Sequence, residues 1–364
     1  IENAQGIENI VEILRVADGI MIARGDMGVE IPLEDVPPIQ KSLIKKASAV
    51  GKYSITATHM LDSMIHHPRP TRAEAADVAN AVYDGTSAVM LSGETAAGKY
   101  PVEALTIMST IAERTEQDID YHSRFLHYHT GQKLNVTTAI SHATCSTAYD
   151  IEAAAIVTVT MSGNTARMIS RYRPEVPIIG CTSDEHTYRQ LSLSWGVQPL
   201  MIEHKDTSEE LFGHAIHVAR DHGYIKNGVV VVITAGVPLG ITGTTNLLRV
   251  HVVGDVLLSA RSVNRYQAVG NLCVCKNEKE ALLNFKSGDI LVIPQTSNQI
   301  LPLMKRASAI ITEQDGLNSH AAIVGMALDI PVLEGAAHAT EILANGTTVR
   351  VDSEKGLVCS VDPE

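Results

Sequence analysis

Acidic, hydroxyl and glycine residues recur just after short apolar segments in the first part of this chain. Asp26 follows one such segment and lies between Gly25 and Gly28, and Glu2, which follows Ile1, is expected at the end of another strand. Carboxylates are the oxygen ligands that a hard divalent cation prefers. Glycines leave backbone N–H groups open to a phosphate oxygen beside that cation. The pattern indicates chemistry on a phosphorylated compound next to a metal ion.

Two further apolar segments end in small polar groups. The first ends at Thr58, and the second is followed by Ser92 and Glu94. Each of these residues, taken singly, is also compatible with a solvated surface position. If the segments are parallel strands, however, their carboxyl ends share one edge of a sheet, where α/β proteins place their active sites.

The elements that must position these residues follow from hydrophobic periodicity. Apolar residues at helical spacing predict a helix over residues 7–14, and three later helices are predicted over residues 38–49, 71–83 and 101–116. Strands are predicted over residues 19–23, 53–58 and 88–91, with an Arg-Gly-Asp-x-Gly turn after the first. Strand, polar turn and helix recur about every 35 residues, as in a (β/α) barrel.

Two more α/β regions follow. Residues 119–253 predict a helix over 137–149 and a doubly wound sheet with strands over 154–160, 176–181, 197–202 and 229–234. Residues 254–364 predict short strands over 290–293, 309–312, 331–333 and 348–351, with a helix starting near Ser319. The predicted domains are therefore 1–118, 119–253 and 254–364, and the predicted linker is 254–265.

Composition excludes several classes of protein. The 364 residues are 45% hydrophobic and carry a net charge of −12, which argues against nucleic-acid binding. No apolar run approaches the ~20 residues of a membrane span. Five cysteines without a secretory segment predict reduced thiols in the cytoplasm. Cys273 and Cys275 suit a strand better than half a metal site, because no second Cys/His pair stands at ligand spacing.

Five ordered motifs resemble pyruvate kinase, and the resemblance extends over about residues 1–253. Their sequences are Glu-Asn at 2–3, Ala-Arg-Gly-Asp-Met-Gly-Val-Glu at 23–30, Thr-Ala-Thr-His-Met-Leu-Asp-Ser-Met at 56–64, Pro-Arg-Pro-Thr-Arg-Ala-Glu at 68–74 and Met-Leu-Ser-Gly-Glu-Thr at 90–95. The resemblance implies the last three strands of a TIM (β/α)8 barrel, then a doubly wound α/β effector domain, then a swivelling phosphohistidine-like β/α domain.

The resemblance implies phosphoryl transfer between phosphoenolpyruvate and ADP, which gives pyruvate and ATP. Glu2 and Asp26 would then bind Mg²⁺ or Mn²⁺, and the backbone of Gly25 and Asp26 would receive the substrate carboxylate. Thr58 would lie near the methylene carbon that is protonated. Arg24, Ser92 and Glu94 are the other catalytic candidates. Catalysis would be mainly electrostatic.

Other implications concern assembly and the remainder of the enzyme. Arg72 would steady the Asp-Met-Gly turn of a neighbouring subunit in a homotetramer. His59 stands where the family usually has Gln, and Tyr53-Ser54 replaces Pro-Val. The family's catalytic Lys would immediately precede Ile1, and the K⁺ and nucleotide ligands would also lie upstream. We therefore expect the C-terminal part of a longer enzyme, unable to catalyse alone.

A hydroxyl-rich loop in the second region is a candidate phosphate site. It comprises Thr160, Ser162, Gly163, Asn164 and Thr165, after a strand and at a helix start. An ordinary helix cap is the alternative. The resemblance favours the family's effector-phosphate loop, covered by a Gly/Thr-rich stretch at 235–246. That stretch lacks an Arg for a second phosphate, so AMP or ribose 5-phosphate is expected rather than fructose 1,6-bisphosphate.

The third region places His320 at a helix start after a Gly-rich loop, where a phosphorylated imidazole would be stabilised by the helix dipole. A structural histidine is the alternative. The stretch resembles the phosphohistidine domain of phosphoenolpyruvate synthase and pyruvate phosphate dikinase. Asp315 replaces a usual Gly, and Asn318 replaces a usual Thr, so we expect a structural or regulatory vestige.

Three functions from different classes follow. The leading one is a pyruvate kinase regulated by a phosphorylated effector. The second is a phosphohistidine-dependent phosphotransferase, which requires a competent His320. The third is a non-catalytic regulatory fragment that binds an effector at its hydroxyl-rich loop.

Overall fold

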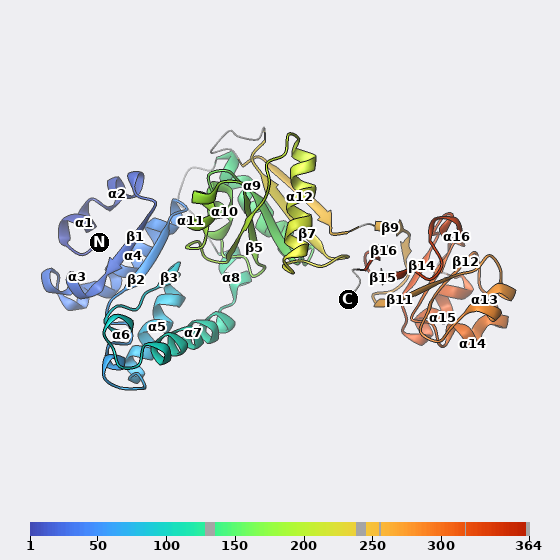
Figure 1. Ribbon diagram of the computed structural model, residues 1–364, viewed down its shortest axis with the longest axis horizontal. Coiled ribbons are helices and arrows are strands. Elements are labelled where there is room, and N and C mark those ends of the chain that lie inside the picture. The colour runs from blue at the N-terminus through green and yellow to red at the C-terminus, as the bar shows by residue number, and fades with distance from the viewer. Residues whose placement is uncertain (128–134, 238–244, 255, 317, 362–364) are drawn as a thin grey trace. The chain divides into compact units, whose positions relative to one another are not determined.

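The computed structural model describes residues 1–127, 135–237, 245–254, 256–316 and 318–361 (Figure 1). The chain forms two compact units. One comprises Ile1–Ala219 and Val232–Val250, and the other comprises Arg220–Val231 and His251–Glu364. Within the described residues, three sheets of three, five and eight strands make it a mixed α/β protein.

The first sheet has three parallel strands in the order β1-β2-β3. They are β1 (Gly19–Ala23), β2 (Tyr53–Ala57) and β3 (Ala88–Val89). Gly19 pairs with Tyr53 and Ala23 with Ala57, so β1 and β2 begin and end together. Their carboxyl ends therefore form one edge, as the sequence predicts.

Eight helices accompany this sheet within the described part of the first 127 residues. They are α1 (Ala4–Glu8), α2 (Ile10–Val16), α3 (Arg24–Glu30), α4 (Val36–Ala49), α5 (Arg72–Asp84), α6 (Gly93–Ala96), α7 (Pro101–Asp118) and α8 (Tyr121–Leu126). Apolar side chains of α2, β1 and α4, among them Ile10, Ile22 and Leu43, form one buried cluster. Burial of such aliphatic side chains stabilises the fold.

Two local predictions in this region are wrong. Residues 7–14 do not form one helix, because α1 and α2 are separated at Asn9, whose Nδ2 donates to the carbonyl of Gln5 at 2.9 Å. The predicted Arg-Gly-Asp-x-Gly turn is instead the start of α3, and Met27 in that helix is fully buried. Burial of Met27 against the α2–α4 cluster offsets the low helix propensity of the glycines.

The second sheet has the strand order β6-β5-β4-β7-β8. Its strands are β4 (Ala155–Val159), β5 (Ile178–Thr182), β6 (Val197–Met201), β7 (Val230–Ala235) and β8 (Leu247–Val252), and its helices are α9 (Val136–Asp150), α10 (Asn164–Ser170), α11 (Glu185–Leu191) and α12 (Ser208–Asp221). Every residue of β4, β5 and β7 is buried. The strand order reverses between β4 and β7, which is where doubly wound sheets bind ligands.

The third sheet has the order β10-β14-β13-β12-β11-β15-β16-β9. The strands are β9 (Val256–Ser259), β10 (Arg261–Ser262), β11 (Gln267–Val274), β12 (Ile290–Ile293), β13 (Ala309–Thr312), β14 (Val332–Glu334), β15 (Thr348–Asp352) and β16 (Leu357–Ser360), and the helices are α13 (Glu278–Asn284), α14 (Leu301–Met304), α15 (His320–Leu328) and α16 (Ala339–Ile342). The predicted linker at 254–265 is wrong, because β9 and β10 pair with β16 and β14 there.

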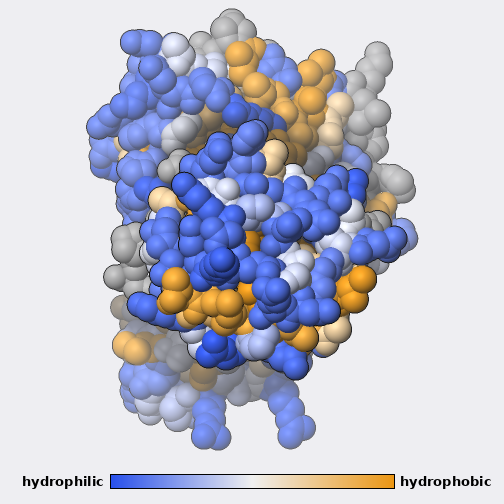
Figure 2. All heavy atoms as spheres, turned by 90° about the vertical axis from the view of Figure 1, so that its right-hand side faces the viewer, coloured by the Kyte–Doolittle hydropathy of each residue, from blue (hydrophilic) through white to orange (hydrophobic). Residues whose placement is uncertain are grey.

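Helices α13 and α15 of the third region expose apolar side chains. Leu282, Leu283, Ile323 and Met326 are each between 49% and 84% exposed. Figure 2 shows separate hydrophobic patches on an otherwise hydrophilic side of the molecule. In the described part of the chain, no helix has the length and apolar character needed to cross a bilayer.

Candidate active site

The carboxyl edge of β1 and β2 brings several predicted residues together. The amino group of Ile1 donates to the carbonyl of Met21 at 2.6 Å, and Ala23 donates to the carbonyl of Ile1 at 3.1 Å. Ile1 therefore pairs with β1 as an additional parallel segment. Glu2 is thereby carried to the edge at which β1 passes into Arg24.

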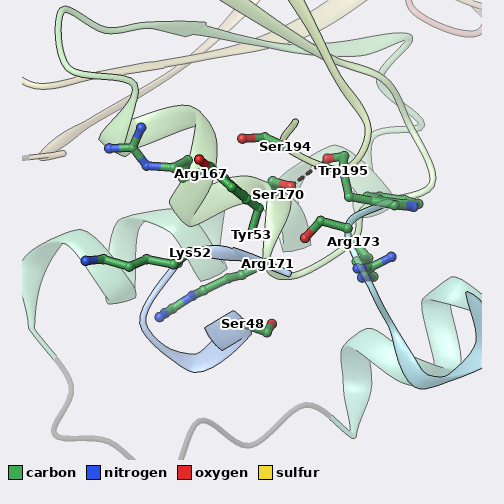
Figure 3. Close-up of a pocket in the computed structure, with 11 residues that line it drawn as sticks. Ser48, Lys52, Tyr53, Arg167, Ser170, Arg171, Arg173, Ser194 and Trp195 are labelled. Atoms are coloured by element: carbon green, nitrogen blue, oxygen red, sulfur yellow. Dashed lines mark hydrogen bonds between the residues drawn. The ribbon is translucent and has the colours of Figure 1, made fainter. Parts of the chain in front are cut away.

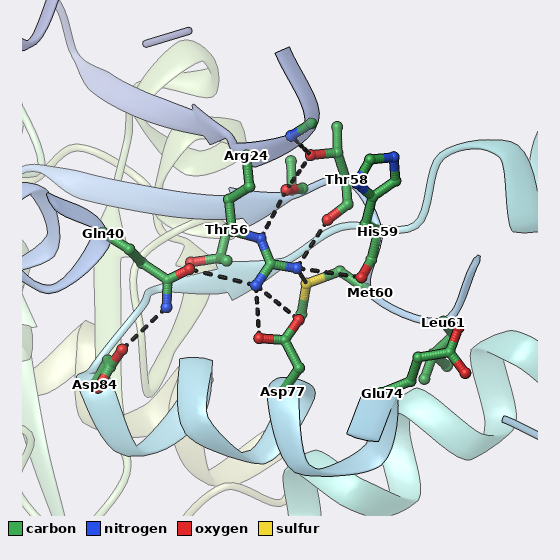
Figure 4. A network of polar contacts seen from close by, with 12 residues as sticks. Arg24, Gln40, Thr56, Thr58, His59, Met60, Leu61, Glu74, Asp77 and Asp84 are labelled. Carbon is green, nitrogen blue, oxygen red and sulfur yellow. Dashed lines mark hydrogen bonds and ion pairs between the residues drawn. The ribbon is translucent and has the colours of Figure 1, made fainter. Parts of the chain in front are cut away.

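Arg24 is the most highly bonded side chain at this edge (Figure 4). Its guanidinium donates to the carbonyls of Ala57, Thr58 and His59 at 3.3, 2.8 and 3.5 Å. It also forms an ion pair of 2.7 Å with Asp77 of α5. These contacts use its guanidinium to hold the end of β2, and the catalytic role predicted for Arg24 stays a prediction.

The backbone that Arg24 holds is strained. Thr58 and His59 have φ values of +66° and +51°. A left-handed conformation is rare for any residue with a side chain, and rarest for a β-branched one. Such conformations persist only where the surroundings enforce them, and they are concentrated at functional sites.

Thr58 is tied to the start of α3 as well. The N–H of Gly25 donates to Thr58 Oγ1 at 2.7 Å, and the hydroxyl donates to the carbonyl of Ala57 at 2.7 Å. These bonds fix the position of the hydroxyl. The predicted substrate-binding N–H of Gly25 and the predicted catalytic hydroxyl of Thr58 are therefore neighbours.

The two predicted metal ligands are both exposed. Glu2 precedes α1, and Asp26 lies in the first turn of α3. Among the described residues, no group of three or more His, Cys, Asp or Glu side chains is arranged to hold a metal ion. Glu2 and Asp26 thus offer two carboxylates, which suits Mg²⁺, because that ion usually takes one or two carboxylates together with water and substrate oxygens.

Glu94 is buried, with 2% of its surface exposed. Its Oε1 accepts the N–H of Leu61 at 3.0 Å, and its Oε2 accepts the N–H of Ser92 at 2.8 Å. One carboxylate thus joins the segment after β2 to the segment after β3. This geometry fits a positioning residue, with Ser92 held at the same edge.

Three further residues, which the sequence does not single out, organise this edge. Asp77 pairs with Arg24, and Gln40 lies 3.4 Å from the same guanidinium nitrogen. Glu74 accepts from the N–H and hydroxyl of Ser63 at 2.7 and 2.6 Å and also completes a capping box with Thr71. The Thr-x-x-Glu spacing signals that capping box; nothing in the sequence signals the long-range pairs.

Hydrogen bonding changes the acidity of Glu74. Partial burial favours the neutral acid, but the bonds from Ser63 and Thr71 outweigh it and lower the pKa of Glu74 below its usual value. Glu74 therefore remains ionised and holds the chain just after the strained segment. Arg72, at the start of the same helix, is exposed and makes no hydrogen bond or ion pair with another described residue.

The predicted phosphate loop lies at the carboxyl end of β4. Gly163 has φ +74° and precedes α10. Thr165 Oγ1 lies 2.8 Å from Thr245 Oγ1, so the start of α10 meets the end of the predicted covering stretch. Residues 238–244 of that stretch are outside the described residues. Thr160 is 8% exposed.

His320 is the first residue of α15, and both its ring nitrogens are engaged. Nδ1 lies 2.9 Å from Thr296 Oγ1, and Nε2 lies 3.1 Å from Asn298 Oδ1. Ser319 caps the helix by accepting from the N–H of Ala322 at 3.0 Å. Asp315 forms an ion pair of 2.8 Å with Arg261.

Comparison with family models identifies three domains. Residues 1–105 match the pyruvate kinase barrel domain, residues 138–251 match the pyruvate kinase alpha/beta domain, and residues 285–356 match the mobile domain of PEP-utilising enzymes.

Known proteins agree with these models. A pyruvate kinase of Geobacillus stearothermophilus is 50% identical over 98% of this chain, and one of Sporosarcina psychrophila is 47% identical over the same share. The chain spans 61% of the length of each. A crystal structure of a pyruvate kinase from Cryptosporidium parvum matches 70% of this chain and 50% of its own, with 40% identity and a TM-score of 0.64. The chain therefore belongs to the pyruvate kinase family.

Proposed function

We propose that the natural protein containing this sequence transfers the phosphoryl group of phosphoenolpyruvate to ADP, giving pyruvate and ATP. The observation that supports this proposal is the edge at which the N–H of Gly25, next to Asp26, donates to the strained Thr58, and at which Ile1, next to Glu2, pairs with β1. The three strands β1–β3 would belong to a (β/α)8 barrel, whose active sites lie at this edge.

Glu2 and Asp26 would bind Mg²⁺ or Mn²⁺, because they are exposed carboxylates at one edge. The bound cation would stabilise negative charge on the transferred phosphoryl group and the enolate. No K⁺ ligand is proposed within this chain.

The described contacts also suggest roles for the protein groups. The backbone of Gly25 and Asp26 would bind the substrate carboxylate, with the N–H of Gly25 exchanging its bond to Thr58 Oγ1 for one to the substrate. Thr58 would lie beside the methylene carbon of enolpyruvate, which gains a proton after the phosphoryl group leaves. Arg24 and Glu94 would act as positioning residues, because their polar atoms hold the backbone after β2 and β3.

The test is formation of pyruvate from phosphoenolpyruvate and ADP by the natural protein, with Mg²⁺ as the only divalent cation. Asp26→Asn should lower kcat/KM at least about a hundredfold, since a metal ligand is lost. It should also weaken Mn²⁺ binding measured by electron paramagnetic resonance. Unchanged Mn²⁺ affinity in both Glu2→Gln and Asp26→Asn would contradict the metal assignment.

The loop at Thr160–Thr165 would bind the phosphate of an allosteric effector, and a monophosphate such as AMP or ribose 5-phosphate is the proposed class. Its place at the switch point of the second sheet supports this role. Activation of the natural enzyme by each sugar phosphate tests the proposal. A strong response to fructose 1,6-bisphosphate would refute the monophosphate assignment.

A homotetramer is the proposed assembly, with the exposed Arg72 at a subunit contact. Light scattering of Arg72→Glu should show smaller species than the native protein, whereas Arg69→Glu serves as an exposed control.

A cytoplasmic location is proposed because all five cysteines are free and buried.

A further inference from the structure

A cleft rich in positive charge lies beside the carboxyl-terminal turn of α4, within the first compact unit. Its wider part has a volume of about 610 Å³ and is lined by Lys45, Lys46, Arg124, Arg171 and Arg173. That volume is in the range of small-molecule sites. On a chain with a net charge of −12, this gathering of cations is unusual.

The cleft continues into a narrow end, shown in Figure 3, which Arg171 and Arg173 share with Lys52 and Arg167. The narrow end has room for about one water-sized group, at about 20 Å³. The wider part is therefore where a small organic anion fits. Ser48, which lines both parts, adds a hydroxyl group at the junction.

The acidic side chain that lines the cleft is already bonded to other residues. Among the described residues that line it, Asp84 is the one acid, and its two oxygens bind Lys41 and Gln40. Near the narrow end, burial lowers the pKa of Arg167, while Asp18 and Tyr53 oppose that shift. No carboxylate that lines the cleft is left to neutralise Arg171 or the two lysines.

Arg171 gives the strongest indication of a ligand. It is 7% exposed, and its Nε has no hydrogen-bond partner in the described structure. The other guanidinium nitrogens donate to the carbonyl of Ala49 at 3.1 Å and to the hydroxyl of Tyr172 at 2.9 Å. These bonds orient the guanidinium at the wall of the cleft. Because Nε itself is closed to solvent, a ligand in the cleft would be attracted by the uncompensated charge and bound by the remaining N–H groups.

We propose that this cleft binds a small phosphorylated metabolite through its phosphate, as a site separate from the loop at Thr160–Thr165. Phosphate matches the donors, because arginine and lysine side chains form charge-assisted hydrogen bonds with its oxygens. The two sites lie at opposite ends of α10: the loop includes Asn164 at its start, and Ser170 at its end borders the narrow part of the cleft.

The test is calorimetric titration of the full chain with inorganic phosphate and, separately, with ribose 5-phosphate, in chloride buffers of matched ionic strength. Both ligands should bind, and tighter binding of ribose 5-phosphate would show that the ester is the preferred form. Binding should weaken as salt increases, because the contacts are ionic. Absence of binding by both ligands would overturn the proposal.

Variants of the lining residues test whether the ligand binds in this cleft. Lys45→Gln combined with Lys46→Gln should weaken binding about tenfold, and so should Arg171→Met. The matched control is Lys276→Gln with Lys279→Gln, which removes the same charge from the other compact unit and should leave affinity unchanged. The two lysines are exposed, so their variant remains informative if Arg171→Met fails to fold. Native affinity in the lysine variant, or loss confined to Thr165→Val, would refute the cleft as the site.

Discussion

The edge after β2 and the start of α15 use polar side chains in opposite ways. At Thr58 and His59 the backbone is strained; Arg24 donates to both carbonyls, and Glu74 holds Ser63 just after them. At His320 the polar side chains bind one another, and both ring nitrogens have neighbours. We infer that strain maintained by other residues marks a site kept for chemistry, and we expect the hydrogen bonds on both ring nitrogens of His320 to reflect a structural role.

The largest effect is expected when the strained segment loses its anchor. Arg24→Met should lower the free energy of unfolding by about 3 kcal/mol, because Asp77 and three carbonyls lose their partner. Chemical denaturation measures this. Arg15→Met, which breaks an exposed pair with Glu12, is the matched control and should change it by less than about 0.5 kcal/mol. Equal effects would remove the distinction that we draw.

The next largest effect on the free energy of unfolding is expected from Glu74. Because the pKa of Glu74 is lower in the folded state, the unfolded state binds the proton more readily. The ionised side chain therefore stabilises the fold above a pH of about 4.3, and this stabilisation is lost as the pH falls through the folded-state pKa. Glu74→Gln should lower stability at pH 7 by about 1 kcal/mol and remove that part of the acid dependence. Denaturation from pH 7 to pH 3 tests it, with the exposed Glu103→Gln as control.

Substitution of Thr58 by glycine tests whether the backbone strain at this position costs stability. Thr58→Gly should leave the free energy of unfolding within about 1 kcal/mol of the native value, since relieved strain offsets the lost bond to Gly25. The natural enzyme should nevertheless lose activity. A variant as active as the native protein would show that Thr58 is not placed for chemistry; His59→Gly gives the corresponding comparison without loss of that hydroxyl.

The smallest effect is expected at His320. Labelled phosphoenolpyruvate should leave no acid-labile adduct, because Thr296 and Asn298 occupy the imidazole and Asp315 repels phosphate. An adduct in the native chain that is absent from His320→Ala would reverse our interpretation. Asp315→Gly with Asn318→Thr tests whether the altered residues suppress transfer.

Much of the fold could be predicted from the sequence. The strands over 19–23, 290–293 and 309–312 match β1, β12 and β13, because buried parallel strands are continuous apolar runs bounded by turns. The edge strands β9 and β10 were missed, because β9 has an apolar run of only three residues and β10 consists of two exposed polar residues. The helix at Arg24–Glu30 was missed because its two glycines resemble a turn.

The amino-acid sequence by itself determined which residues can do chemistry: the carboxylates at 2 and 26, the hydroxyl at 58 and the glycines around Asp26. These depend on residue type and local spacing. Only the tertiary structure decided that the side chains of Arg24 and Glu94 bind backbone groups and that the backbone of Thr58 is in the left-handed region. It also decided that Arg171 is buried with no described hydrogen-bond partner for its Nε. Hydrogen-bond partners and burial arise between segments far apart in the chain, and no local pattern encodes them.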